Sequence, residues 1–171
     1  VSIGAEESGS EQNARQILSA YGLNDKMVSM VNLNYEDAAA QLKAGRVDAI
    51  FMTVGAPSPV LTALAGECGI RLLNVDGAAA QRLQSAYSAY SSVTLPAGTY
   101  PGQTEKAQTV GVKAVLLASN ALPAKQVQQL TQLLFSSREG LEEQLGIPLD
   151  PEENAVEGVG IPFHAGAAAY Y

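Results

Sequence analysis

The chain has 171 residues, a formal net charge of −7 at pH 7 and a hydrophobic fraction of 47%. This length suits one ordinary domain, or one lobe and part of another, with room for a real core. The acidic balance disfavours nucleic acids and anionic membrane surfaces as partners, because both attract basic patches. A small anionic ligand stays open, since local hydrogen-bond donors in a pocket can outweigh the global charge.

The first 90 residues alternate between strand-like and helix-like segments. We predict strands at residues 1–4, 26–33, 47–54 and 70–75, and helices at residues 11–21, 35–44, 59–65 and 78–90. Such alternation predicts an α/β fold with a parallel sheet flanked by helices. In these sheets, ligands bind at the carboxyl ends of the strands, where loops lead into helix N-termini. The loops in that position are residues 5–10, 34 and 53–57.

Proline and glycine mark a change of pattern in the second half of the chain. Regular structure over residues 93–103 is interrupted by Pro96, Gly98, Pro101 and Gly102. We predict a fifth strand at 110–118 and an amphipathic helix at 123–136. The inward face of that helix should carry Val127, Leu130, Leu133 and Leu134. The tail mixes short helices and turns, and we expect it to lie against a surface.

The stretch Ser8-Gly9-Ser10 precedes the first predicted helix. A helix start leaves backbone N–H groups unpaired and carries partial positive charge, while glycine lets a ligand approach closely. Serine hydroxyls add donors, so the stretch suits a carboxylate or another small anion. A plain N-cap at Ser8 or Ser10 explains the same residues. The stretch is neither a P-loop nor a dinucleotide fingerprint, because the required lysine and spaced glycines are missing.

Little in the sequence points to catalysis, a metal or a cofactor. His164 is the only histidine, and we expect it to be structural or to start a helix, because no nucleophile or zinc motif accompanies it. Cys68 is the only cysteine and is expected to be a small residue in or near the core. No spacing of acidic residues provides a metal site. No apolar run reaches the length of a membrane span.

Tyr100 is the most suggestive aromatic residue. It lies in Gly-Thr-Tyr-Pro-Gly-Gln, away from any core periodicity. An aromatic side chain on such a loop can form one wall of a pocket and offer its hydroxyl to a polar ligand. Packing at a hinge explains it equally well.

Several stretches in order together resemble the TAXI family of TRAP-transporter solute receptors. They are VSIGAEESGSEQNARQILSAYGL, AAQLKAGRVDAIF, GAPSPVLTALA, GIRLLNVD, TYPGQ and IPFHAGAAAYY. The first stretch, TYPGQ and HAGAA are the more specific elements, and the resemblance covers nearly the whole chain. The family usually has threonine where Ser10 stands, which keeps the hydroxyl, and often proline where Ala165 stands.

The resemblance implies a two-lobed fold of the type II periplasmic-binding-protein kind, truncated at its start. Residues 1–95 would form the second lobe, an α/β ligand-binding lobe. Residues 96–171 would form the hinge return and the C-terminal part of the first lobe. The missing first-lobe elements, together with an apolar start and no signal peptide, lead us to expect a longer parent protein with a signal peptide upstream and a periplasmic location.

The resemblance also implies which residues face the ligand. The predicted ligand-binding residues are Ser8, Gly9 and Ser10 at the first helix, Thr53, Gly55, Ala56 and Pro57 at the end of the third strand, and Tyr100 near the hinge. A small carboxylate such as glutamate, another amino acid or a dicarboxylate would bridge the lobes and favour the closed state. We expect the chain alone to bind it weakly or not at all, because half of the contacts would be absent, and to be prone to self-association.

Three functions are compatible with these observations. The first is an extracytoplasmic solute receptor that hands its ligand to TRAP membrane subunits, without binding nucleic acid or inserting into the membrane. The second is a cytoplasmic effector-sensing domain of a LysR-type transcription regulator on the same fold. The third, an enzyme, has the least support, because no nucleophile, metal site or cofactor motif is present. TYPGQ and HAGAA favour the receptor.

Overall fold

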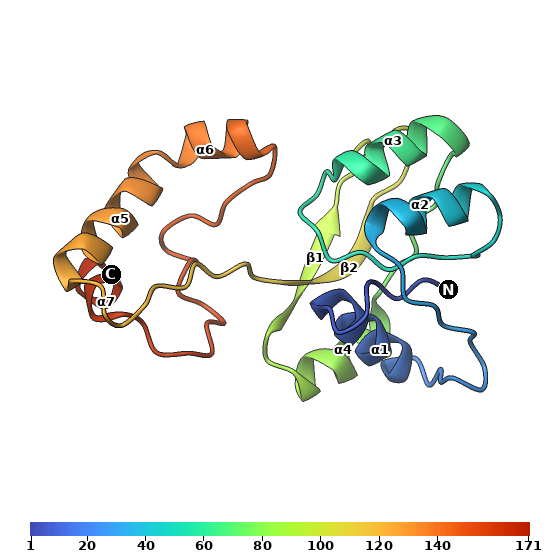
Figure 1. Cartoon of the computed structure of the whole chain (residues 1–171), viewed down its shortest axis with the longest axis horizontal. Helices are drawn as coiled ribbons and strands as arrows, with labels where there is room; N and C mark the ends of the chain where they lie inside the picture. The colour runs from blue at the N-terminus through green and yellow to red at the C-terminus, as the bar shows by residue number, and fades with distance from the viewer. The chain divides into compact units, whose positions relative to one another are not determined.

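A computed structural model describes all residues of the chain, 1–171, as a mixed α/β protein (Figure 1). The chain divides into two compact units, Val1–Gly111 and Val112–Tyr171. None of the helices combines the length and the apolar character that a membrane crossing requires. The assignment of residues 1–95 and 96–171 to two lobes stays a prediction.

The first unit contains four helices and a two-stranded sheet. The helices are α1 (Gly9–Ala20), α2 (Tyr35–Lys43), α3 (Pro59–Cys68) and α4 (Gly77–Ala86). The strands β1 (Tyr90–Leu95) and β2 (Ala107–Val112) are hydrogen-bonded neighbours. All four helices predicted before residue 90 are confirmed, with some of their ends displaced.

Parallel pairing in the first unit is limited to isolated bridges on either side of Ser2. Ser2 pairs in parallel with Val31 on one side and with Ile50 on the other. The Ser2 N–H donates to the Ala49 carbonyl at 2.9 Å, and the Phe51 N–H donates to the Ser2 carbonyl at 2.8 Å. The first predicted strand therefore lies between the second and the third. The prediction of an extended parallel-rich sheet was wrong in its extent.

Local turn chemistry shortens the predicted strands. The side-chain oxygen of Asn24 accepts the Lys26 N–H at 3.0 Å, and residues 25–27 form a turn. Residues 70–75 form no strand either. The Val75 N–H donates to the Gln108 carbonyl of β2 at 2.8 Å, and the Asn74 side-chain oxygen accepts the Gln108 N–H at 3.0 Å in place of a backbone carbonyl. Side-chain hydrogen bonding of this kind overrides the apolar pattern of the segment.

The core of the first unit lies between the start of the chain and α1. Its buried members are Ile3, Ala14 and Leu18, and partly buried hydrophobic residues packed against them are Val1, Leu23, Met30 and Phe51. Gly4 follows this core with a φ of 98°. A Cβ at Gly4 would lie 2.7 Å from the Ser10 Cβ, so only glycine lets the chain pass this close to the start of α1.

The second unit is helical. It contains α5 (Ala124–Ser136), α6 (Arg138–Leu145) and α7 (Ala165–Tyr170). The end of the chain is held against α5, as the tail was expected to lie against a surface: the Phe135 and Tyr170 rings are stacked with centroids 5.9 Å apart. A Cβ at Gly166 would lie 2.1 Å from the Ala124 carbonyl oxygen, so α7 approaches α5 backbone to backbone.

Three predictions of burial and pairing were wrong. Leu130 and Leu133 are 47% and 61% exposed, because α5 packs against α7 and buries only Val127 fully. Cys68 is exposed at the end of α3 rather than near the core. Residues 113–118 follow β2 without strand pairing.

Candidate functional site

The start of α1 is closed by a capping arrangement centred on Ser8. The Ser8 hydroxyl donates to the Ala5 carbonyl at 2.6 Å and accepts the Glu11 N–H at 3.1 Å. The Glu11 carboxylate turns back and accepts the Glu7 N–H at 2.8 Å. The Ser-x-x-Glu spacing therefore acts as a capping box displaced by one residue. The helix itself occupies the Ser8 hydroxyl.

Two backbone donors remain open at this helix start. The N–H groups of Gly9 and Ser10 donate to no atom of the chain, because the residues one turn earlier lie outside the helix and their carbonyls are not aligned with it. Gly9 is exposed, and a Cβ placed on it would meet nothing within 4 Å. The helix dipole adds partial positive charge. The site thus offers donors and room to a group that only accepts hydrogen bonds.

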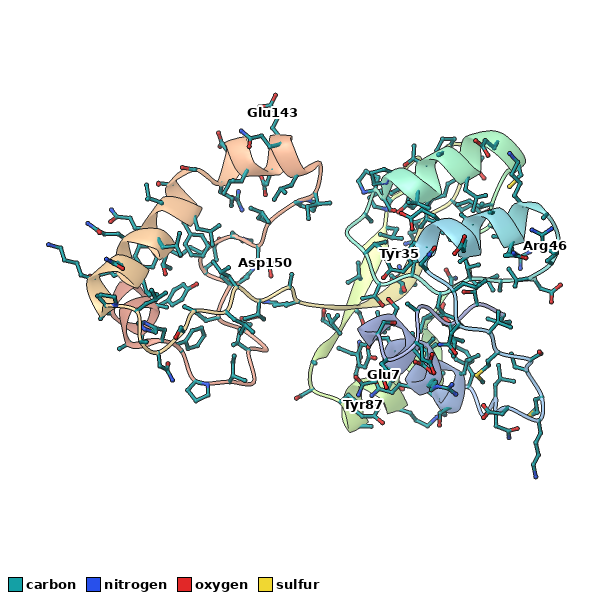
Figure 2. All side chains as sticks on the ribbon, in the orientation of Figure 1. Glu7, Tyr35, Arg46, Tyr87, Glu143 and Asp150 are labelled. Atoms are coloured by element: carbon teal, nitrogen blue, oxygen red, sulfur yellow. The ribbon has the colours of Figure 1, made fainter.

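A chain of hydroxyl groups joins the three loops that the sequence placed at strand ends. The Ser10 and Tyr35 hydroxyl oxygens lie 2.6 Å apart, and Tyr35 donates to the Thr53 carbonyl at 2.9 Å. Because Tyr35 has a single hydroxyl proton, Ser10 is the donor in the first of these bonds. Ser10 is only 6% exposed. Tyr35 lies at the N-terminal end of α2 (Figure 2).

A second chain of hydrogen bonds reaches Thr53 from β1. The Asn13 side-chain nitrogen donates to the Thr53 hydroxyl oxygen at 3.1 Å. The Tyr90 hydroxyl lies 2.7 Å from the Asn13 side-chain oxygen and 2.6 Å from that of Gln16. Tyr90 is buried at the start of β1. Since Thr53 accepts from Asn13, its own hydroxyl proton is left for another acceptor, and Thr53 is exposed.

Tyr100 lies elsewhere in the same unit and is only 3% exposed. Its hydroxyl accepts the N–H of Ser58, the N-cap residue of α3, at 3.1 Å. Its own N–H donates to the Gln103 side chain at 3.2 Å, and Gln103 also donates to the carbonyls of Pro96 and Glu105. This turn fixes Tyr100 against the segment before α3. No hydrogen bond within the chain uses the hydroxyl proton of Tyr100.

The other predicted residues follow Thr53 along the irregular segment that leads into α3. Gly55 and Pro57 are exposed, and Ala56 is half-buried. The structure therefore connects Ser10 and Thr53 through the Tyr35 hydroxyl and places Gly9 beside Ser10. Tyr100 is linked to them only through the segment between Thr53 and Ser58.

Electrostatics around the helix start are set by Glu11. Hydrogen bonds from Arg15 and from the Glu7 N–H lower the pKa of the Glu11 carboxyl from its usual 4.5. Arg15 contacts Glu11 at 2.9 Å and is therefore not available as a free cation for a ligand.

Burial raises the pKa of the Tyr90 hydroxyl, with a smaller contribution from Tyr87, whose ring lies edge-on at 6.2 Å. Tyr90 is thus a neutral donor at physiological pH.

The predicted residues line neither the depression beside α4 nor the one at the junction of α5 and α6. A small polar depression of about 140 Å³ lies between α4, β1 and β2, lined by residues that include Asp76, Gln84 and Gln108. No group of three or more histidine, cysteine, aspartate or glutamate side chains is placed to hold a metal ion.

His164 is the N-cap residue of α7 and accepts the Gly166 N–H at 3.0 Å, which confirms its expected role at a helix start.

Sequence reasoning missed Tyr35, Asn13, Tyr90 and Gln16. Asn13 was within reach of the sequence, because it lies one turn after Ser10 and shares its face of α1. Tyr35 directly follows Asn34, which the sequence predicts to lie at the ligand-facing end of a strand. Tyr90 gave no local signal, since its partners lie 77 and 74 residues earlier in the chain.

The sequence model of the NMT1-like family matches the whole chain, residues 1–171. This is a periplasmic-binding-protein-like family, and the match indicates a role in binding a solute or substrate. The mixed α/β architecture and the open donors at the start of α1 agree with that role. The chain belongs to the NMT1-like family.

Proposed function

We propose that the chain is part of an extracytoplasmic solute receptor of the TAXI type that binds a small carboxylate for a TRAP transporter. The observation that carries the ligand class is the polarity of the site. The Gly9 and Ser10 N–H groups and the Thr53 hydroxyl are donors that no atom of the chain occupies. A carboxylate accepts hydrogen bonds through both oxygens and donates none, so it complements three donors.

The TAXI assignment is supported by TYPGQ and HAGAA, together with the match of the chain to a periplasmic-binding-protein-like family. In this proposal the protein works in the periplasm and delivers its ligand to the membrane subunits of the transporter. It acts by binding and release, without catalysis or a cofactor. Co-purification with TRAP membrane subunits tests the partner separately from the ligand.

Glu6, Glu7 and Glu11 lie near the open donors and disfavour an anion by repulsion. Their effect is limited, because the Glu11 carboxylate is already paired with Arg15 and surface charges are screened by salt. Hydrogen bonds to an ionised acceptor contribute about 1.5–3 kcal/mol each, so two or three donors outweigh a screened repulsion.

A saturation-transfer NMR screen of the 171-residue chain tests the ligand class. The panel contains glutamate, glutamine, succinate and glutarate, each of which can be detected at millimolar affinity. Gly9→Ala is the matched variant, because it adds a methyl group where the site is open while the helix backbone needs no glycine there. Alanine also favours the helix, so stability should not fall.

We expect at least one carboxylate to bind and Gly9→Ala to weaken it without lowering the melting temperature. The proposed ligand class is wrong if no carboxylate gives a signal with either the 171-residue chain or the whole receptor of which we propose it is part. It is also wrong if Gly9→Ala leaves the signals unchanged.

A further inference from the structure

Asn13 lies between the Thr53 and Tyr90 hydroxyls, and its orientation decides which part of the Thr53 hydroxyl is left for a ligand. We propose that Asn13 is a specificity-determining positioning residue, which keeps the Thr53 hydroxyl proton available and so makes the site select acceptors. This inference rests on the proposed carboxylate-binding function and deepens it. Asn13 acts through Thr53 and needs no contact with the ligand.

The two distances at Asn13 agree with one orientation of its amide. The contact to the Thr53 hydroxyl is 3.1 Å, a length ordinary for N–H···O, and the contact to the Tyr90 hydroxyl is 2.7 Å, a length ordinary for O–H···O. The nitrogen therefore faces Thr53, and the oxygen faces Tyr90. In this orientation Thr53 accepts, and its proton points to another partner.

Tyr90 holds this orientation. Its hydroxyl donates to the side-chain oxygens of both Asn13 and Gln16, at 2.7 and 2.6 Å, in a three-centre hydrogen bond. The Asn13 oxygen is thereby held toward Tyr90, which leaves the Asn13 nitrogen to donate to Thr53 at 3.1 Å. The bonds run in one direction, from Tyr90 through Asn13 to Thr53.

The opposite direction would reverse the chemistry of the site. If the Asn13 oxygen faced Thr53, the Thr53 hydroxyl would donate to it and would present only lone pairs to a ligand. The oxygens of a carboxylate would then face the lone pairs of the Thr53 hydroxyl without a proton between them. A ligand group that donates, such as an amide N–H, would be favoured. Asn13→Asp imposes this state, because an ionised aspartate accepts hydrogen bonds and donates none.

The test compares glutarate with its diamide, glutaramide, as probes of the 171-residue chain by NMR titration. Asn13→Asp adds a negative charge, so Gln12→Glu serves as the matched charge control on the neighbouring exposed position of α1. Both substitutions are repeated in a Thr53→Val background. Thr53→Val removes the hydroxyl through which Asn13 acts. The double-mutant cycle therefore isolates the coupling between Asn13 and Thr53.

We expect Asn13→Asp to lower the preference for glutarate over glutaramide by about tenfold more than Gln12→Glu does, as the loss of one charge-assisted hydrogen bond implies. In the Thr53→Val background the two substitutions should have equal effects. The proposal is overturned if Asn13→Asp matches the charge control with Thr53 present. It is also overturned if the extra loss persists without Thr53.

A second measurement needs no ligand, so it separates this proposal from the proposed function. Solvent exchange of the Asn13 side-chain N–H protons should accelerate in Thr53→Val more than in Tyr90→Phe, because the nitrogen faces Thr53. The reverse order would place the nitrogen toward Tyr90 and would refute the orientation. Failure of wild-type binding to both probes, with the expected exchange order, would count against the carboxylate function and leave the orientation of Asn13 intact.

Discussion

The bond between Ser10 and Tyr35 gives the most detailed prediction for the stability of the first unit. Tyr35→Phe keeps the ring and removes the hydroxyl, which accepts from Ser10 at 2.6 Å and donates to the Thr53 carbonyl at 2.9 Å. Thr53 is exposed, so water replaces its lost bond. Ser10 is 6% exposed, so its donor stays buried without a partner. A buried unsatisfied donor costs about 1–3 kcal/mol, and we expect a loss of stability in that range.

The matched variant is Ser10→Ala, which removes the donor together with the need for an acceptor. It should cost about 0.5–1.5 kcal/mol, the net contribution of an ordinary hydrogen bond. The double variant, Ser10→Ala with Tyr35→Phe, should be less destabilised than the sum of the two single variants, because no donor is then left unsatisfied.

Native-state hydrogen exchange of α1 amide protons is the suitable assay, since it reports the opening free energy of this unit by itself. The reasoning fails if Tyr35→Phe costs less than Ser10→Ala. Strict additivity in the double variant would also refute it, because it would show that the two hydroxyls do not depend on each other.

Three further predictions concern two glycines at close backbone contacts, Gly4 and Gly166, and the charge of Glu11 in the first turn of α1. Gly4→Ala should lower the melting temperature clearly, because its Cβ would lie 2.7 Å from another Cβ at a φ of 98°; a melting temperature equal to wild type would contradict this. Gly166→Ala should detach α7 from α5, since its Cβ would lie 2.1 Å from a backbone oxygen of α5, and tyrosine near-ultraviolet circular dichroism should report the loss of ring stacking. The Glu11 carboxyl has a lowered pKa in the folded state, so its contribution is present above the usual 4.5 and is lost as pH falls through the folded value. Glu11→Gln should therefore reduce the acid dependence of unfolding, and an unchanged pH profile would exclude this contribution.

Local patterns predicted the helices, because their signals lie within one or two turns. Ser8 and Asn34 cap α1 and α2 through their own side chains. Proline at the first position of α3 and histidine before α7 likewise act over a few residues. Such signals need no knowledge of the tertiary fold.

The strands and the burial of α5 could not be predicted in the same way. The apolar run at residues 26–33 predicts a strand, but the side chain of Asn24 competes for the backbone and forms a turn. The leucine stripe of α5 predicts an inward face, yet Leu133 is exposed because a glycine lets α7 pack beside Val127 instead. Both outcomes depend on partners that the local pattern does not contain.

The sequence predicts that the loops at 5–10, 34 and 53–57 lie close together, and Ser10, Tyr35 and Thr53 do join these three segments by hydrogen bonds. That a ligand binds there stays a prediction. Of the two serines predicted to face a ligand, Ser8 is engaged by the helix cap and Ser10 by Tyr35. The open donors are the Gly9 and Ser10 N–H groups, as a helix start predicts, and the Thr53 hydroxyl, which is open because Asn13, distant in the sequence, donates to it.

The proposed function requires that a carboxylate binds the open donors at the start of α1. An NMR titration of the 15N-labelled chain with glutarate follows the Gly9 and Ser10 amide resonances individually and is therefore the decisive test. We expect downfield, saturable shifts of these two amide protons, larger than those of α5, with glutaramide giving smaller shifts. Saturable shifts confined to other residues, or equal shifts with both compounds, would contradict it.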